Sequence, residues 1–215
     1  MASVTKSVAE QLDTLEARGL FDLAHGESAT VKAAAAALRA STARNETALV
    51  GLHPASFAAS ALAPLMSREG KPGFVVGDMT DVDEFLPFGF DLPEHPLYLV
   101  YGVERGDELQ NVTPEEALPQ ITAVSRRGLT LHEGLSWAIT HPDVIEANNC
   151  FMTIGSRKAK AIDRAGDVVY DTRTPALWNA SGTGRDGKER RGAPKLGWCW
   201  WRNRHTWLGI ASAQR

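Results

Sequence analysis

The stretch that decides what to expect of this chain is Leu196-Gly-Trp-Cys-Trp-Trp-Arg-Asn-Arg-His-Thr-Trp-Leu208. Five of the six tryptophans lie between residues 178 and 207, and aromatic residues are enriched in β-strands. The polar segment 202–204 is typical of a turn between two apolar runs. We therefore expect residues 195–201 and 206–211 to pair as a tryptophan-rich antiparallel hairpin.

Upstream of this stretch, helix starts are marked by capping boxes, in which a Ser, Thr or Asp precedes a Glu by three residues. The pattern occurs four times, at Ser7–Glu10, Asp81–Glu84, Thr113–Glu116 and Thr130–Glu133. With the apolar spacing that follows, it predicts helices over 8–18, 29–42, 55–66, 113–125 and 130–140, and a helical turn after Pro142.

Apolar runs between the helices predict strands at 48–52, 73–79, 97–103, 151–154 and 176–178. The run 97–103 is almost continuously apolar, which is typical of a central strand. Helices come first, the middle is mixed and strands come last. This order favours an α+β fold over a regular βαβ repeat.

Composition suggests an N-terminal helical segment (1–45) followed by an α+β domain (46–215). Within the latter, residues 181–192 are rich in glycine and charge, so we expect a mobile loop that joins two strands of a hairpin. The same segment contains Gly182-Thr-Gly-Arg-Asp-Gly187, which matches a dinucleotide-binding fingerprint letter for letter. That chemistry needs a strand before the motif and a helix after it, and no apolar helical face follows.

Charge is unevenly distributed in this 215-residue chain of net charge −3. Residues 1–150 carry 21 acidic and 10 basic side chains, whereas residues 151–215 carry five acidic and 13 basic ones. The basic segment indicates either an anionic ligand or attraction to the acidic part of the chain. Two cysteines, no secretory signal and no apolar run of membrane-spanning length indicate a cytoplasmic protein.

Aromatic, basic and imidazole groups gather in the C-terminal third, where an aromatic wall beside Arg can bind a flat or anionic ligand. His205 is the candidate acid–base group, and Cys199 is a candidate nucleophile. The candidate binding residues are Arg157, Lys195, Trp198, Trp200, Asn203 and Trp207. The alternative is that the tryptophans are core or cross-strand pairs and that the cysteines are inert buried thiols. No two of the six histidines have the i, i+4 spacing of a helical zinc pair, so we expect no metal and no cofactor.

Several segments also resemble a known family. They are Asn111–Pro119, Leu129–Gly134, Gly155–Arg157, Pro194–Trp200 and His205–Gly209. Together they resemble, over roughly residues 50–215, an actinobacterial family of proteins of about this length that is classed as a domain of unknown function. The resemblance implies no activity, cofactor or catalytic residue.

Three functions remain open at this point. The first is a small-molecule binding protein or small enzyme that acts on an anionic or planar substrate at the Trp/Arg/His cluster. The second is a non-catalytic interaction or oligomerisation module, in which the alanine-rich N-terminal helices form a homodimer or partner surface. Nucleic-acid binding through the basic segment is the third, and the acidic net charge argues against it.

Overall fold

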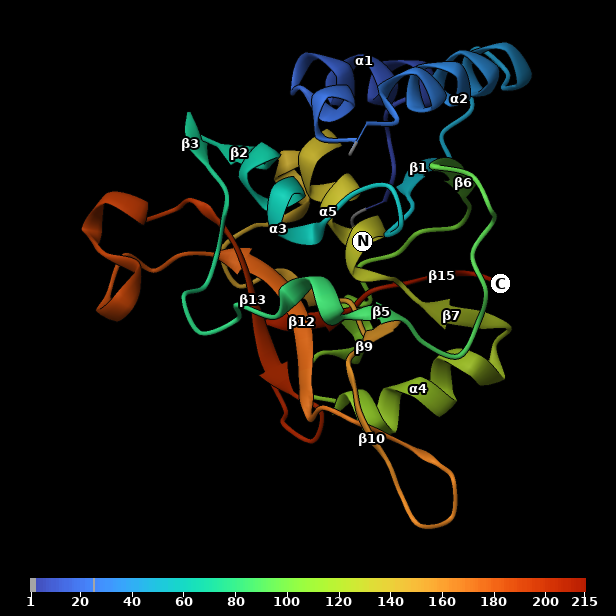
Figure 1. Cartoon of the computed structure of the whole chain (residues 1–215). Coiled ribbons are helices and arrows are strands. Elements are labelled where there is room, and N and C mark those ends of the chain that lie inside the picture. Colours follow the sequence, from blue (N-terminus) through green and yellow to red (C-terminus); the bar gives the residue numbers. More distant parts are fainter. Residues whose placement is uncertain (1–2, 25) are drawn as a thin grey trace.

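The computed structural model describes residues 3–24 and 26–215, and it confirms the α+β class (Figure 1). The α-helices of these residues are α1 (Val8–Ala17), α2 (Ser28–Ser41), α3 (Ala59–Leu62), α4 (Pro114–Ala123) and α5 (Leu131–Thr140). Capping boxes begin α1, α4 and α5, at Ser7, Thr113 and Thr130. In each, the cap oxygen accepts the Glu backbone N–H and the Glu carboxylate accepts the cap N–H, so local sequence sets the start.

Two helix predictions are wrong in detail. Asp81 does not cap a helix, and only a 3₁₀ turn, Val82–Glu84, follows it. Its carboxylate is instead bound by Arg173. The predicted helix over 55–66 is reduced to α3 and the 3₁₀ turn Ala63–Leu65. Pro64 lies in that turn and has no N–H to continue a helical hydrogen-bond ladder.

The strands are short, and most of them form two-stranded sheets. They are β1 (Leu49–Leu52), β2 (Ser67–Arg68), β3 (Lys71–Pro72), β4 (Phe74–Val75), β5 (Leu86–Pro87), β6 (Leu97–Val100), β7 (Arg126–Gly128), β8 (Cys150–Met152), β9 (Ser156–Arg157), β10 (Ala159–Ile162), β11 (Val168–Tyr170), β12 (Arg173–Asn179), β13 (Pro194–Trp200), β14 (Leu208–Ile210) and β15 (Ser212–Gln214). The largest sheet has five strands in the order β14-β8-β12-β13-β4. The others pair β1 with β6, β2 with β3, β5 with β9, β7 with β15 and β10 with β11.

The tryptophan-rich strand β13 does form an antiparallel hairpin, but not with the predicted partner. It pairs with β12 over seven residues, from Arg173↔Trp200 to Asn179↔Pro194, so the segment 181–192 joins two strands of a hairpin as predicted. Pairing with 206–211 is wrong, because β14 lies parallel to β8 with β8 and β12 between it and β13. The partner of β13 is β12, which lies before the 181–192 segment, and local turn signals do not show that strands on either side of so long a segment pair.

The apolar strand β6 is not a central strand, as its sequence predicted. It pairs with β1 alone in a two-stranded antiparallel sheet. Helices take the place of further strands, since α2 lies against β6 while α1 and α5 lie against β1. The apolar run therefore reflects burial beneath helices rather than a central place in a sheet.

Helix α5 is the centre of the core, and all ten of its residues are buried. It lies between β1 and β12, two strands of different sheets. Gly134 permits close packing on this side, because a Cβ there would lie 2.5 Å from the Cγ2 of Thr153 and 3.1 Å from the Cδ1 of Leu177 on β12. Leu12 and Leu15 of α1 belong to the same buried cluster as Trp137 of α5. The division of the chain at residue 45 stays a prediction.

The hairpin β10–β11 projects away from the body of the molecule, below α4 in Figure 1. Its apolar side chains Ile162, Val168 and Val169 are exposed. Among the described residues, no helix combines the length and the apolar character that crossing a membrane would require.

Candidate functional site

Arg157 is the centre of the strongest candidate site. It lies on β9, which is held against β5 by the register Leu86↔Arg157, and only 8% of the residue is exposed. Its guanidinium carbon lies 3.8 Å from the ring centroid of Trp201, and 5.4 Å from that of Tyr170. The cation is therefore buried against aromatic faces, which attract it electrostatically.

The positive charge of Arg157 has no acidic partner among the described residues. Its Nη2 donates a hydrogen bond to the backbone oxygen of Asp171 at 2.7 Å, while its Nε is buried without any partner. Burial lowers the pKa of Arg157, and the nearby Asp171 charge opposes this shift without forming an ion pair, so the guanidinium stays charged at neutral pH. A buried charge without a direct ion pair is costly, and a bound anion would reduce that cost.

A hollow of about 350 Å³ opens beside this guanidinium. Its walls are Arg157, Tyr170, Trp200 and Trp201. Trp200 is 44% exposed, so part of its indole remains uncovered beside the hollow. A volume near the lower end of known ligand sites suits a small molecule.

The rim of the hollow carries two charges that cancel. Arg202 donates to the carboxylate of Glu115 at 2.9 and 3.0 Å, and both side chains are exposed. The backbone N–H of Glu115 also donates to the oxygen of Trp201 at 3.3 Å, which ties the start of α4 to the hollow. The uncompensated charge of the site is therefore that of Arg157.

The structure brings only some of the candidate residues to this hollow. Arg157 and Trp200 line it, and Trp198 packs edge-to-face on Trp200 with ring centroids 4.6 Å apart. Lys195 is paired with Asp186 at 2.8 Å and lies elsewhere on β13. Asn203 is exposed in the turn that follows β13, where its backbone N–H donates to the oxygen of Trp200 at 3.1 Å.

His205 and Trp207 do not line the hollow. Their rings pack edge-to-face with centroids 5.6 Å apart, and Trp207 packs in the same way on Trp178 at 5.9 Å. The Nε2 of His205 is buried without a partner among the described residues, and burial lowers the pKa of His205. These three rings form an aromatic cluster in which the imidazole stays neutral at pH 7.

Cys199 points away from the hollow, because it alternates with Trp198 and Trp200 along β13. Burial raises the pKa of its thiol to about 12. A nucleophilic cysteine needs a lowered pKa, so at neutral pH this side chain is a buried thiol.

Sequence reasoning missed five of the residues that line this hollow: Glu115, Tyr170, Thr172, Trp201 and Arg202. Alternation along a continued strand would place Trp201 on the face opposite Trp200, but β13 ends at Trp200 and the chain then turns. Tyr170 follows two valines in a short apolar run that carries no functional signal. The only sequence signal for Trp201 and Arg202 is that they directly follow Trp200.

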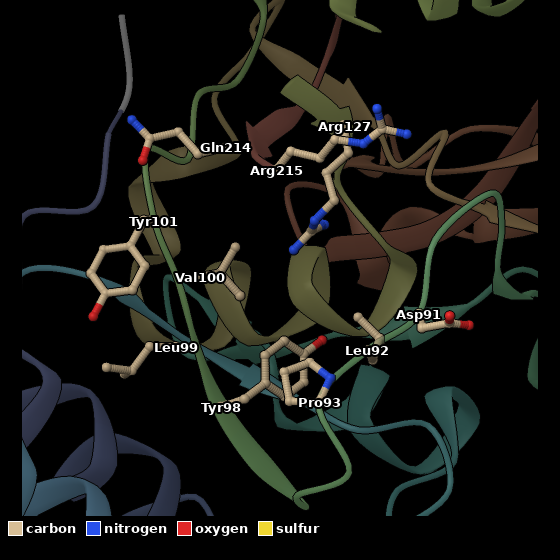
Figure 2. Close-up of a pocket in the computed structure, with 10 residues that line it drawn as sticks. All are labelled: Asp91, Leu92, Pro93, Tyr98, Leu99, Val100, Tyr101, Arg127, Gln214 and Arg215. Atoms are coloured by element: carbon tan, nitrogen blue, oxygen red, sulfur yellow. The ribbon is translucent and has the colours of Figure 1, made fainter. Parts of the chain in front are cut away.

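A second hollow, of about 280 Å³, has Tyr98 and Arg127 on its wall (Figure 2). Arg127 donates to both carboxylate oxygens of Glu133, at 2.7 and 2.8 Å, and the Tyr98 hydroxyl donates to the same carboxylate at 3.0 Å. Burial, together with this carboxylate, raises the pKa of Tyr98. Arg215 and Asp91 also line this hollow and carry opposite charges. Because Glu133 neutralises Arg127 and Asp91 offsets Arg215, this hollow is a weaker anion site than that of Arg157.

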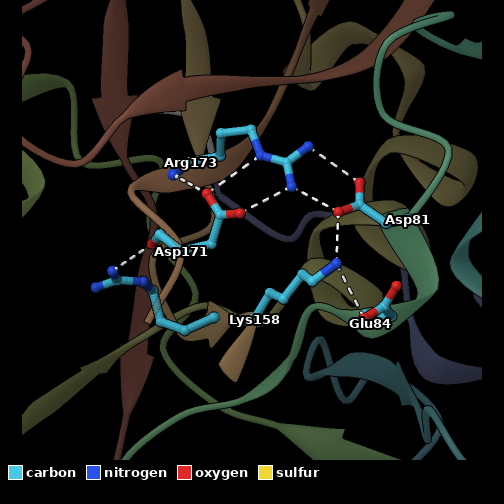
Figure 3. A network of polar contacts seen from close by, with 6 residues as sticks. Asp81, Glu84, Lys158, Asp171 and Arg173 are labelled. Carbon is cyan, nitrogen blue, oxygen red and sulfur yellow. Dashed lines mark hydrogen bonds and ion pairs between the residues drawn. The ribbon is translucent and has the colours of Figure 1, made fainter. Parts of the chain in front are cut away.

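A third cluster of charges surrounds Arg173 (Figure 3). Arg173 donates to Asp81 at 3.0 and 2.5 Å and to Asp171 at 3.2 and 2.9 Å, and Lys158 also pairs with Asp81 at 2.7 Å. Hydrogen bonds from Arg173 lower the pKa of both carboxyl groups. Every charge of this network has a partner, so we assign it a structural role.

Metal ligands do not gather in the part of the chain that the structure describes. No group of three or more His, Cys, Asp or Glu side chains there is arranged to hold a metal ion. His25, one of the six histidines considered above, lies outside the described residues.

Comparison with known proteins adds a family and no activity. No curated protein and no solved structure matches this chain. One family model matches residues 14–215, and the match begins well before the segment near residue 50 where the resemblance was expected to start. The chain therefore belongs to the "Family of unknown function (DUF5701)".

Proposed function

We propose that this protein binds a small planar anion in the hollow beside Arg157. The observation that carries the proposal is an arginine that is 8% exposed, with its guanidinium stacked on Trp201 and no ion pair to an acidic side chain among the described residues. An anion bound there would supply the missing counter-charge, and charge-assisted hydrogen bonds to Arg are among the stronger polar contacts in proteins.

The residues around the hollow favour binding over catalysis. Its walls offer indole and phenol rings for stacking, which suits a flat ligand. General acid–base catalysis is most efficient with a group whose pKa lies near the working pH. Glu115, which is the only carboxylate among the described residues that line the hollow, is engaged by Arg202, and His205 lies away from it. The proposal keeps the predicted C-terminal site but moves its centre from His205 to Arg157.

A thermal-shift screen of small aromatic anions tests the proposal. A compound that binds the folded state raises the melting temperature, and the rise grows with its concentration. We expect hits with the native protein and with Arg185→Gln, since Arg185 lies in the 181–192 segment with its side chain 89% exposed. Arg157→Gln should lose these shifts. Hits that raise the melting temperature of Arg157→Gln by the same amount would refute the proposal.

Self-association is a second candidate function, and the exposed β10–β11 hairpin favours it. Isolated two-stranded sheets are marginally stable in water, and unpaired strand edges invite pairing with another chain. Exposed Ile162 and Val168 would then pack in a homodimer. Light scattering on the native protein and on an Ile162→Lys, Val168→Lys variant tests this. A dimer that becomes a monomer in the variant supports it, and an unchanged mass rejects it.

We also propose that the protein works in a reducing, cytoplasmic compartment, because both Cys150 and Cys199 are buried and unbridged. Cell fractionation of a tagged chain tests this, and recovery in a secreted fraction would reject it.

A further inference from the structure

We infer that the ligand of the Arg157 hollow is a monocarboxylate carried on a flat ring system, rather than a phosphate or a neutral aromatic compound. The inference rests on the proposed function and specifies its ligand class. It follows from the net charge of the hollow, from the direction in which Arg157 can still donate, and from the aromatic walls.

The charge around the hollow matches a single negative charge. The charged residues that line it are Arg157, Arg202 and Glu115, and the last two neutralise each other as an ion pair at 2.9 Å. The site therefore carries one net positive charge. A phosphate monoester has close to two negative charges above pH 7, so part of its charge would stay uncompensated and would face Glu115. A carboxylate has one.

The remaining donors of Arg157 favour a planar acceptor. Trp201 covers a face of the guanidinium at 3.8 Å, so a ligand on that side is excluded and approach along the edge is favoured. Nη2 already donates to the backbone oxygen of Asp171, and Nε is buried, so Nη1 is the donor left for a ligand. Its N–H groups lie in the guanidinium plane, which suits the in-plane lone pairs of a carboxylate that approaches along the edge.

The rest of the hollow suits a ring. Tyr170 and the exposed indole of Trp200 form its walls, and aromatic side chains prefer to pack on flat ligands in stacked or edge-to-face arrangements. The volume of about 350 Å³ restricts the ligand to a small molecule. A compact aromatic carboxylate satisfies the charge, the donors and the walls together.

Isothermal titration at pH 7.5 with four probes tests the ligand class. The probes are naphthalene-2-carboxylate, 2-naphthyl phosphate, naphthalene-2-carboxamide and cyclohexanecarboxylate. The three naphthalene compounds share one ring system and differ in charge. The two carboxylates share one charge and differ in the planarity of the ring. We expect the native protein to bind naphthalene-2-carboxylate at least about tenfold more tightly than the carboxamide, which is the effect of one charge-assisted hydrogen bond. The phosphate and the non-planar carboxylate should also bind more weakly.

Two variants and one control make the test specific. Arg157→Gln should bind the carboxylate no better than the carboxamide, whereas Arg185→Gln should behave as the native protein does. Glu115→Gln leaves the capping pair Thr113–Glu116 of α4 intact and releases Arg202. It should therefore improve phosphate binding more than carboxylate binding, by about threefold, since exposed ion pairs contribute up to about 1 kcal/mol.

The outcomes separate this inference from the proposed function. If the phosphate or the carboxamide binds best and its binding depends on Arg157, the monocarboxylate class is wrong while the hollow remains a ligand site. If every probe binds Arg157→Gln as it binds the native protein, or none binds either, both the class and the proposed function are overturned.

Discussion

Arg157 and Arg173 are two poorly exposed arginines that share one neighbour and use it in opposite ways. Arg173 donates to the carboxylate of Asp171 and to that of Asp81, so its charge is fully paired. Arg157 takes only the backbone oxygen of Asp171 and stacks on Trp201. Arg173 therefore faces two carboxylates of the protein, whereas Arg157 lines a hollow. In this molecule, the missing acid distinguishes a binding arginine from a structural one.

The two environments should also differ in what they contribute to stability. Removing one member of a buried ion pair leaves a charge without compensation, which is strongly destabilising. Removing a buried charge that has no acidic partner leaves no such charge behind. Substitution of each arginine therefore tests the contrast between Arg157 and Arg173.

The largest expected effect is that of Arg173→Met. It should lower the free energy of unfolding by about 3 kcal/mol, because the carboxylates of Asp81 and Asp171 lose their main partner. Arg157→Met should cost less than about 1 kcal/mol, the scale of the one hydrogen bond it loses. Urea denaturation of the two variants measures both values. Equal costs would contradict the contrast between the two arginines.

Acid should reduce the Arg173 effect and leave the Arg157 effect unchanged. Arg173 lowers the pKa of Asp81 and of Asp171 below the ordinary value of 3.8, so their stabilising contribution is present above that pH. It is lost as the pH falls through the lowered folded-state values. The gap in unfolding free energy between native protein and Arg173→Met should thus narrow below about pH 4. Urea midpoints measured from pH 7 to pH 3 test this, and a constant gap would contradict it.

Arg157→Lys should weaken the binding of naphthalene-2-carboxylate by about tenfold while keeping the charge, because Lys lacks the planar fork that stacks on Trp201 and meets a carboxylate edge. Titration calorimetry measures the change. If lysine binds the ligand as well as arginine does, the hollow needs only a positive charge, and the planar part of the account is wrong.

The sequence predicted those structural features that depend on residues close together in the chain. The capping boxes at Ser7 and Thr113 were confirmed because cap and Glu lie in one helical turn. The same spacing at Asp81 failed, since Arg173, 92 residues away, takes the carboxylate. The order of helices and strands predicted the α+β class. The pairing of β13 with β12 and of β14 with β8 could not be predicted in this way, because these strands are far apart in the sequence.

The sequence predicted some of the residue types at the candidate site but not how the fold arranges them. Arg157 and Trp200 were identified from residue type, and both line the hollow. Tyr170 and Glu115 come from a hairpin and a helix start that only the fold brings to Trp201. The imidazole of His205 is four residues from Trp201 in sequence, yet it turns to the cluster of Trp207 and Trp178.

The smallest expected effect concerns those earlier candidates. His205→Asn and Cys199→Ala should change the affinity for naphthalene-2-carboxylate by less than about twofold, because surface and remote sites couple weakly to a ligand they do not touch. The same titration measures both. A tenfold loss in either variant would return the site to the aromatic cluster around His205.

The most direct test of the central claim is a crystal structure of the protein with naphthalene-2-carboxylate. We predict a carboxylate oxygen within about 3 Å of the Arg157 Nη1, and the ring against Trp200 and Tyr170. A ligand bound instead beside Arg127 and Tyr98, or one with its carboxylate turned to solvent and away from Arg157, would contradict the account.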